Sequence, residues 1–220
     1  MVKALLCDMD GTLLDSNDLH AECWQRCLET FGIHVTAGEV KRQIGKGGDQ
    51  MLPVFVDKAR LAEIEEPLNA CKKKLWNAEY MDKVAPFPQA RELMEAIADA
   101  GIRIAMASSA GKEELDQYLN IVGIAGLIDK KTTSDDAEKS KPEPDIFLAA
   151  LGKLGLPPEQ TIALGDTPWD AQSAGRAGVR TIGVESGGWA AEDLRQAGCI
   201  EVYRDASDML SRLKESKLIK

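Results

Sequence analysis

Residues 8–16 read DMDGTLLDS and directly follow an apolar run, VKALLC, at residues 2–7. This run is short and mostly apolar, so it predicts a buried strand that ends at the first Asp. Asp8 and Asp10, followed by a Gly-Thr pair, then stand where a parallel strand opens into a loop. Open α/β sheets bind their ligands at this place. An Asp-x-Asp pair alone is typical of a solvated turn, but with the strand before it the segment predicts an active site.

Composition limits the classes of protein to which the chain can belong. It has 220 residues, enough for one large domain or a core with a smaller unit, and 44% of them are hydrophobic. The 27 basic and 36 acidic residues give a formal net charge of −9, without a basic stripe. We therefore expect neither nucleic acid nor an anionic membrane as the main partner. Because no cleavage site follows the N-terminal run and no segment has membrane-spanning length, we expect a soluble cytoplasmic protein, as a monomer or dimer.

The chain has five cysteines, an odd number, and none of them forms a Cys-x-x-Cys motif. This pattern predicts that no disulfide framework holds the chain together. His20, Cys23 and Cys27 would share one face of a helix, where they could bind a soft metal ion. Because cysteine is usually a small buried apolar residue, we favour core packing for this face.

The spacing of apolar residues divides the chain into a helical part and an alternating part. The helical part has a helix expected over residues 18–31, a short helix that Thr36 caps and a longer helix that begins at Pro67. In the other part strands alternate with helices, which predicts a parallel sheet with right-handed crossovers. The strands are expected near residues 102–107, 127–133, 161–164, 179–184 and 200–203.

The first strand and the later strands must share this sheet, so the helical part is an insertion. We therefore predict an α/β fold with a Rossmann-like parallel-sheet core formed by residues 1–15 and 85–220. A helical domain, residues 16–84, would be inserted into this core.

Polar side chains follow several predicted strands, and the carboxyl ends of parallel strands lie at one edge of a sheet. The residues expected to converge there are Asp8, Asp10, Ser108, Lys141, Asp166 and Asp170. Clustered carboxylates repel one another unless a cation lies between them, and their hard oxygens select Mg²⁺. A serine hydroxyl and a lysine ammonium beside that cation suit a phosphate group. The cluster predicts phosphoryl transfer.

Three of these residues also have plain structural interpretations when each is taken alone. Ser108 is then a helix cap, Lys141 a surface charge and Asp170 an acid in the first turn of a helix. Because the two Asp motifs occur in the same chain, we favour a functional role for all three residues.

The motifs and their order resemble those of the haloacid dehalogenase superfamily of hydrolases. They are Asp8-x-Asp10-Gly-Thr, Ser108, Lys141-Pro and Gly-Asp166-x-x-x-Asp170. The resemblance covers essentially the whole chain. The helical insertion is similar to the small α-helical cap domain of the phosphoglycolate phosphatase and β-phosphoglucomutase branch.

The resemblance implies a role for each motif residue. Asp8 would attack phosphorus to form an aspartyl-phosphate, and Asp10 would protonate the leaving alcohol and later take a proton from water. Mg²⁺ would be bound by the carboxylates of Asp8 and Asp166 and by the backbone carbonyl of Asp10. Lys141 would offset charge on the phosphoryl group, and Asp170 would hold Lys141 or a metal-bound water in place. The groups that bind the phosphate would be Gly11, Thr12, Ser108, Ser109 and Lys141.

Residues of the helical insertion are candidates for contact with the rest of the substrate. They are Ser16, His20, Gly45, Lys46 and Gly47. His20 would steer Asp10 or touch substrate, or else pack between helices. The glycine-rich loop around Lys46 lacks the spacing of a P-loop. It would either read a second anionic group of the substrate or form a plain turn.

The resemblance implies a Mg²⁺-dependent phosphatase for small phosphomonoesters such as a sugar phosphate or phosphoglycolate. An acid at Asp10 fits esters whose alkoxide must be protonated. The alternative is a sugar-phosphate mutase, but Gly165 and Asp49 stand where the β-phosphoglucomutase pattern has Glu and Arg. A protein that binds a phosphorylated metabolite without turnover is a further alternative.

Overall fold

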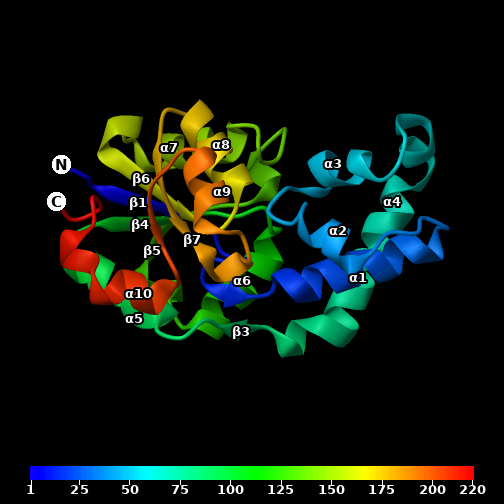
Figure 1. The fold of residues 1–220 in the computed structure, drawn as a ribbon, viewed down its shortest axis with the longest axis horizontal. Coiled ribbons are helices and arrows are strands. Elements are labelled where there is room, and N and C mark those ends of the chain that lie inside the picture. Colours follow the sequence, from blue (N-terminus) through cyan, green and yellow to red (C-terminus); the bar gives the residue numbers. More distant parts are fainter.

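The computed structural model describes residues 1–220 and has a parallel six-stranded sheet as its core (Figure 1). The strand order is β5-β4-β1-β6-β7-β8, and every neighbouring pair is parallel. The strands are β1 (Ala4–Cys7), β4 (Arg103–Ala107), β5 (Ile128–Thr132), β6 (Thr161–Gly165), β7 (Arg180–Val184) and β8 (Cys199–Tyr203). The predicted α/β fold is confirmed.

The first strand lies in the middle of the sheet, between β4 and β6. Its side chains alternate: Leu5 and Cys7 join the apolar cluster on one face, and Ala4 and Leu6 join the cluster on the other. Burial on both faces explains why the strand is a continuous apolar run. From β1 the chain builds the sheet first to one side and then to the other, so the carboxyl end of β1 is a switch point of the topology.

Helices cover both faces of the sheet (Figure 1). On the Leu5 face pack α5 (Ala90–Asp99), α6 (Lys112–Val122) and α10 (Ala206–Ser211). On the Leu6 face pack α7 (Asp145–Leu154) and α8 (Pro168–Arg176). The short helix α9 (Ala191–Gln196) packs against β8.

A helical insertion interrupts the chain between β1 and β4. Its helices are α1 (Asn17–Thr30), α2 (Ala37–Lys41), α3 (Gly48–Met51) and α4 (Lys58–Leu75), and a π-helical turn (Trp76–Tyr80) follows α4. The chain enters and leaves this insertion through a small antiparallel pair, β2 (Leu14–Asp15) and β3 (Ala85–Pro86).

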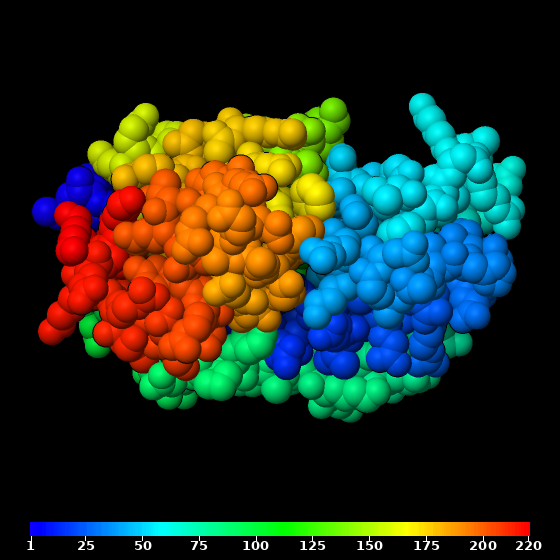
Figure 2. All heavy atoms as spheres, viewed as in Figure 1, coloured from blue at the N-terminus to red at the C-terminus, as the bar shows by residue number.

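The insertion has its own cluster of 12 buried apolar residues and forms a separate lobe at one end of the molecule (Figure 2). Both chain termini lie at the opposite end, beyond the sheet (Figure 1). None of the helices combines the length and the apolar character needed to cross a membrane.

The start of α4 corrects a prediction from the sequence. The helix does not begin at Pro67; it begins at Lys58, where the Asp57 side chain accepts hydrogen bonds from the amides of Ala59 and Arg60. Pro67 lies inside the helix on its exposed side. The Asp cap compensates the free amides of the first turn, which is the usual way a helix begins.

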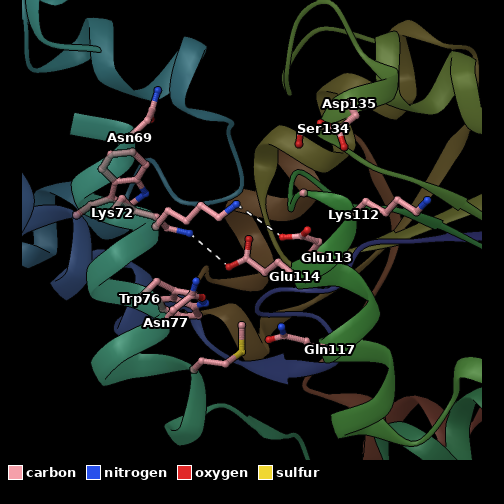
Figure 3. A pocket seen from close by; sticks show the side chains of 14 residues that line it. Asn69, Lys72, Trp76, Asn77, Lys112, Glu113, Glu114, Gln117, Ser134 and Asp135 are labelled. Carbon is pink, nitrogen blue, oxygen red and sulfur yellow. Dashed lines mark hydrogen bonds and ion pairs between the residues drawn. The ribbon is translucent and has the colours of Figure 1, made fainter. Parts of the chain in front are cut away.

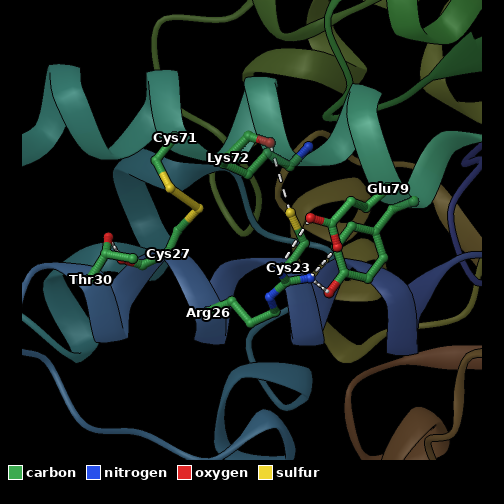
Figure 4. Close-up of a disulfide and its surroundings, with 8 residues drawn as sticks. Cys23, Arg26, Cys27, Thr30, Cys71, Lys72 and Glu79 are labelled. Carbon is green, nitrogen blue, oxygen red and sulfur yellow. Dashed lines mark hydrogen bonds and ion pairs between the residues drawn. A yellow bond between two sulfur atoms is a disulfide. The ribbon is translucent and has the colours of Figure 1, made fainter.

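A disulfide between Cys27 and Cys71 also differs from the expectation (Figure 4). The two cysteines come from α1 and α4, which pack together so that the Cα atoms are 6.0 Å apart. That separation lies within the range in which a disulfide can form. The prediction from the odd count of cysteines was wrong because it weighed number and motif, whereas the distance between two helices decides. The remaining cysteines are free and buried.

Candidate active site

The predicted site residues meet at the carboxyl edge of the sheet. Asp8 directly follows β1, Ser108 follows β4 and Asp166 follows β6. Lys141 comes from the connection between β5 and α7, and Asp170 from the first turn of α8. Four segments that are distant in the sequence therefore place their side chains around the switch point of the topology.

Lys141 is fully buried between two carboxylates. Its Nζ lies 2.6 Å from Asp8 Oδ1 and 2.7 Å from Asp170 Oδ1. Burial alone would lower the pKa of Lys141, but the charges of Asp170 and Asp8 outweigh it and raise the pKa. Lys141 therefore stays charged, and it is not the surface charge of the alternative interpretation.

Asp170 owes its position to the start of α8. It forms a capping box with Thr167: the Thr167 amide donates to Asp170 Oδ2 over 3.1 Å, and the Asp170 amide donates to Thr167 Oγ1 over 3.2 Å. This arrangement satisfies amides of the first helical turn. The other carboxylate oxygen faces Lys141, so Asp170 is a helix cap and a partner of Lys141 at once.

Asp166 is fully buried and has no cationic partner. Its carboxylate accepts hydrogen bonds from Thr12 Oγ1 at 3.1 Å and from Asn17 Nδ2 at 2.9 Å. Burial, together with the charges of Asp170 and Asp8, raises its pKa well above the usual value. Oxygens of Asp8, Asp166 and Asp170 lie within 4.8 Å of one another, the arrangement of a possible metal site.

Two glycines allow the backbone to approach Asp166 closely. Gly11 has a φ of +73°, and a Cβ there would collide with the side chains of Asn17 and Asp166. A Cβ at Gly187 would collide with the same carboxylate. Glycine is the only residue that fits such a close approach, so both positions serve the carboxylate cluster.

Asp10 differs from Asp8 because it faces the space between the sheet and the insertion, with 18% of its side chain exposed. Its Oδ1 accepts a hydrogen bond from Ser16 Oγ at 2.6 Å and lies 3.1 Å from His20 Nε2. Burial would raise the pKa of Asp10, but the charge and hydrogen bond of His20 and the hydrogen bond of Ser16 outweigh it and lower the pKa. The His20 ring stacks on Trp76 with 3.8 Å between ring centroids.

A cleft of roughly 110 Å³ opens beside Asp10 and is lined from both parts of the chain. The insertion contributes His20, Lys46, Gly47 and Lys72, and the sheet edge contributes Ser109.

The loop that contains Lys46 turns toward the sheet edge. Gly45 O accepts a hydrogen bond from Ser109 Oγ at 3.3 Å, and Gly47 packs against the Ser140 side chain. Lys46 Nζ lies 3.9 Å from the centroid of the Trp169 ring. The loop therefore contacts the core, whereas a plain solvated turn would not.

Sequence reasoning missed several polar residues of the site. Asn17 reads as the first residue of a helix, and Glu114 and Tyr118 read as parts of an ordinary amphipathic helix. Ser108 was predicted, but it shares no hydrogen bond with the carboxylates; its Oγ accepts from the Ala110 amide at 3.1 Å. Only its position after β4 places it at the site.

Comparison with known proteins identifies the family. Residues 5–184 match the family model described as haloacid dehalogenase-like hydrolase. The chain belongs to this family. The family expected from the order of the motifs is therefore confirmed, and with it the enzyme class, a hydrolase.

Relatives of this haloacid dehalogenase-like hydrolase extend over most of the chain. A phosphorylated carbohydrates phosphatase of Thermotoga maritima is 26% identical over 218 residues, which cover 97% of this chain and 99% of the relative. A phosphoglycolate phosphatase of Aquifex aeolicus is 31% identical over 183 residues, 82% of this chain and 83% of the relative. The crystal structure of a hydrolase from Pseudomonas syringae superposes with a TM-score of 0.85 at 28% identity, covering 97% of this chain and 98% of that one. The matched length includes the insertion.

Proposed function

We propose that this hydrolase is a Mg²⁺-dependent phosphatase that cleaves small phosphomonoesters through an aspartyl-phosphate on Asp8. The observation that carries the proposal is the placement of Asp8 at the switch point, with Lys141 2.6 Å from one oxygen and Thr12 3.3 Å from the other. The names of the relatives from T. maritima and A. aeolicus support a phosphorylated carbohydrate or phosphoglycolate as the kind of substrate.

The charges of the site fit a divalent cation. Lys141 pairs with Asp8 and Asp170, which leaves Asp166 with neutral partners only. Burial and the neighbouring carboxylates also raise the pKa of Asp8, despite Lys141. A cation bound by the Asp8 and Asp166 carboxylates and the Asp10 carbonyl would keep both carboxylates ionised. Mg²⁺ bound there would polarise a phosphate oxygen and offset its charge.

Phosphoryl transfer would proceed in two steps on these residues. A carboxylate oxygen of Asp8 forms a bond to phosphorus while the bond from phosphorus to the ester oxygen breaks, and Asp10 gives its proton to that oxygen. Water then attacks the phosphorus of the aspartyl-phosphate while the bond from phosphorus to the Asp8 oxygen breaks. Asp10 takes a proton from the water, the Asp8 carboxylate is restored, and inorganic phosphate leaves. Lys141 Nζ lies beside the attacking group, where it can offset charge that develops on the phosphoryl oxygens.

Asp10 must be protonated for the first step and ionised for the second. In the free site His20 and Ser16 lower its pKa, which favours the ionised form. A phosphate dianion that enters beside Asp10 adds negative charge and raises that pKa again. Substrate binding would thus favour the protonated form of Asp10, which can give its proton to the leaving alcohol.

The helical insertion would act as the cap domain. We assign residues 16–84 to this cap and residues 1–15 and 85–220 to the core. The cleft lies between the two, and Lys46 and Lys72 face it from the cap side, where they would meet the part of the substrate beyond the phosphate. Closure of the cap would exclude bulk water during transfer.

The test is phosphate release from phosphoglycolate and a set of sugar phosphates, with Mg²⁺ and with chelator. We expect release that needs Mg²⁺ and that disappears in Asp8→Asn, a change that removes the nucleophile and keeps the shape of the side chain. Asp15→Asn, a change at an exposed position in the same segment, is the matched control. Phosphate release by Asp8→Asn at the wild-type rate would exclude the mechanism. Interconversion of sugar phosphates without release of phosphate would indicate a mutase.

A further inference from the structure

A chain of polar side chains runs from Asp10 through both parts of the molecule. His20 Nε2, on α1, lies 3.1 Å from Asp10 Oδ1 and 3.2 Å from the hydroxyl of Tyr118 on α6. The Tyr118 hydroxyl donates to Glu114 Oε1 at 3.0 Å. Lys72 Nζ, on α4, lies 3.4 Å from the same oxygen of Glu114. The chain therefore passes from the core to the insertion, back to the core and again to the insertion.

The hydrogen bonds of this chain fix the role of the His20 Nε2 atom. The Tyr118 hydroxyl donates to Glu114 Oε1, so its single hydrogen is used toward that oxygen. The Tyr118 oxygen can then only accept from His20 Nε2, as an ionised Asp10 also does. Nε2 must therefore carry the hydrogen. Glu114 and Tyr118 thus leave His20 Nε2 as the donor toward Asp10.

The same residues fix the plane of the His20 ring. Tyr118 is fully buried, so its hydroxyl is a fixed point. One face of the His20 ring stacks on the Trp76 ring, at an interplanar angle of 6°. Only 7% of His20 is exposed. A ring held by a stack and by an oxygen from another helix keeps one orientation, as a well-positioned proton-transfer site requires.

Glu114 also takes part in the contact between α6 and α4. Two ion pairs cross the space between these helices: Lys72 with Glu114, and Lys73 with Glu113 at 3.7 Å between Nζ and Oε2 (Figure 3). They border a cavity of roughly 650 Å³ lined mainly by polar and charged side chains. The Lys72–Glu114 pair is mostly buried, with 17% and 21% of the side chains exposed. The pair can form only while the insertion lies close to α6.

We propose that Tyr118 and Glu114 are positioning residues for proton transfer by Asp10. They orient His20, which holds the Asp10 carboxyl, and because Lys72 joins them from α4, the orientation is complete only when the insertion is closed. This inference rests on the proposed phosphatase function, since it concerns the proton that Asp10 gives to the leaving alcohol.

The leaving group provides a direct test. An alkyl phosphate needs that proton, whereas p-nitrophenyl phosphate releases a phenolate that is stable without it. The alkyl ester is phosphoglycolate or glucose 6-phosphate, whichever the wild type hydrolyses faster. In Tyr118→Phe, kcat for this ester should fall by about fivefold to tenfold, the size expected of one lost hydrogen bond. The value of kcat for p-nitrophenyl phosphate should stay within about twofold. Tyr203→Phe, whose hydroxyl contacts Glu201 at 3.2 Å in another part of the core, should change neither.

Two variants of Glu114 test the same positioning role, and they suffice if Tyr118→Phe does not fold. Glu114→Ala removes the acceptor of the Tyr118 hydroxyl and should reproduce the selective loss for the alkyl ester. Glu114→Gln keeps an acceptor oxygen at the same place and should recover most of that activity.

Equal losses for the alkyl ester and p-nitrophenyl phosphate, or no loss for either, would overturn the positioning role. A folded wild-type protein that releases phosphate from none of these esters would instead overturn the proposed function, and this inference with it.

Discussion

At the scale of single residues, the site is governed by one buried cation among several carboxylates. Lys141 touches Asp8 and Asp170, and both partners are buried too. Charges in such a place are stable only as a group, because each loses its hydration. Removing the lysine would leave the two acids facing each other and Asp166.

We therefore expect Lys141→Met to lower the free energy of unfolding by about 3 kcal/mol or more, the size seen when one partner of a buried ion pair is removed. Mg²⁺ should restore part of the loss, because a second cation then shares the carboxylates. Urea unfolding with Mg²⁺ and with chelator measures both effects. Lys139→Met, at an exposed position of the same loop, is the control. A variant as stable as wild type in chelator would contradict the account.

At the scale of elements, strands were easier to predict than helix starts. The central strand, β1, is a continuous apolar run that ends at a charge, and the structure has it at Ala4–Cys7. The start of α4 was missed because Pro67 is a strong signal for a first turn, and it outweighed the regular spacing of Leu61, Ile64 and Leu68. Tertiary packing of this apolar face extends the helix on both sides of the proline.

The site shows the same division between local and long-range signals. Asp8 and Asp166 could be placed at the sheet edge because each directly follows a strand, and strand ends of a parallel sheet are neighbours. Asp10 could be placed there because it lies two residues beyond Asp8. Tyr118 could not, because it meets His20 across 98 residues of sequence. That contact depends on how the insertion lies against α6, and no periodic pattern in the sequence encodes this arrangement.

The packing of α1 against α4 depends on a covalent bond as well as on apolar contacts. Cys27 and Cys71 are joined across a loop of 44 residues, and Arg26 of α1 pairs with Glu79 beyond the end of α4 (Figure 4). For a loop of this length, chain entropy predicts about 4 kcal/mol of stabilisation.

Reductant should therefore lower the melting temperature of the wild-type protein and leave the double variant Cys27→Ser, Cys71→Ser unchanged. Thermal unfolding with and without dithiothreitol makes this comparison. Cys199→Ser, which removes a free buried cysteine, should respond to reductant as the wild type does. Equal sensitivity of the double variant would mean that the bond does not stabilise the insertion.

At the scale of the whole molecule, the core and the insertion are joined by two chain crossings and by the apolar cluster of the core, which includes Cys23, Trp76 and Tyr80 of the insertion. The insertion also has an apolar cluster of its own and forms a lobe at one end (Figure 2). The cleft beside Asp10 is lined from both the core and the insertion. Polar contacts line the cleft side of the boundary between the two, including Gly45 with Ser109 and Asp49 with the Ser140 amide at 3.1 Å. Contacts of this kind break and re-form more easily than an apolar core.

Binding of Mg²⁺ with vanadate, a mimic of the transferring phosphoryl group, should therefore slow amide hydrogen exchange at the facing segments, residues 43–48 and 109–114. Residues 199–213, at the far side of the core, should keep their exchange rates and serve as the internal control. Hydrogen-exchange mass spectrometry resolves these peptides. Equal slowing in all of them would indicate general stabilisation and would argue against closure of the insertion.

The position of the chain termini has a practical consequence. Both lie at the end of the core opposite the insertion (Figure 1). A tag, a fluorescent protein or a solid support attached at either terminus would stand away from the cleft. Immobilised protein should then turn over substrate as the free protein does, and a force or fluorescence probe at the ends would leave motion of the insertion unhindered.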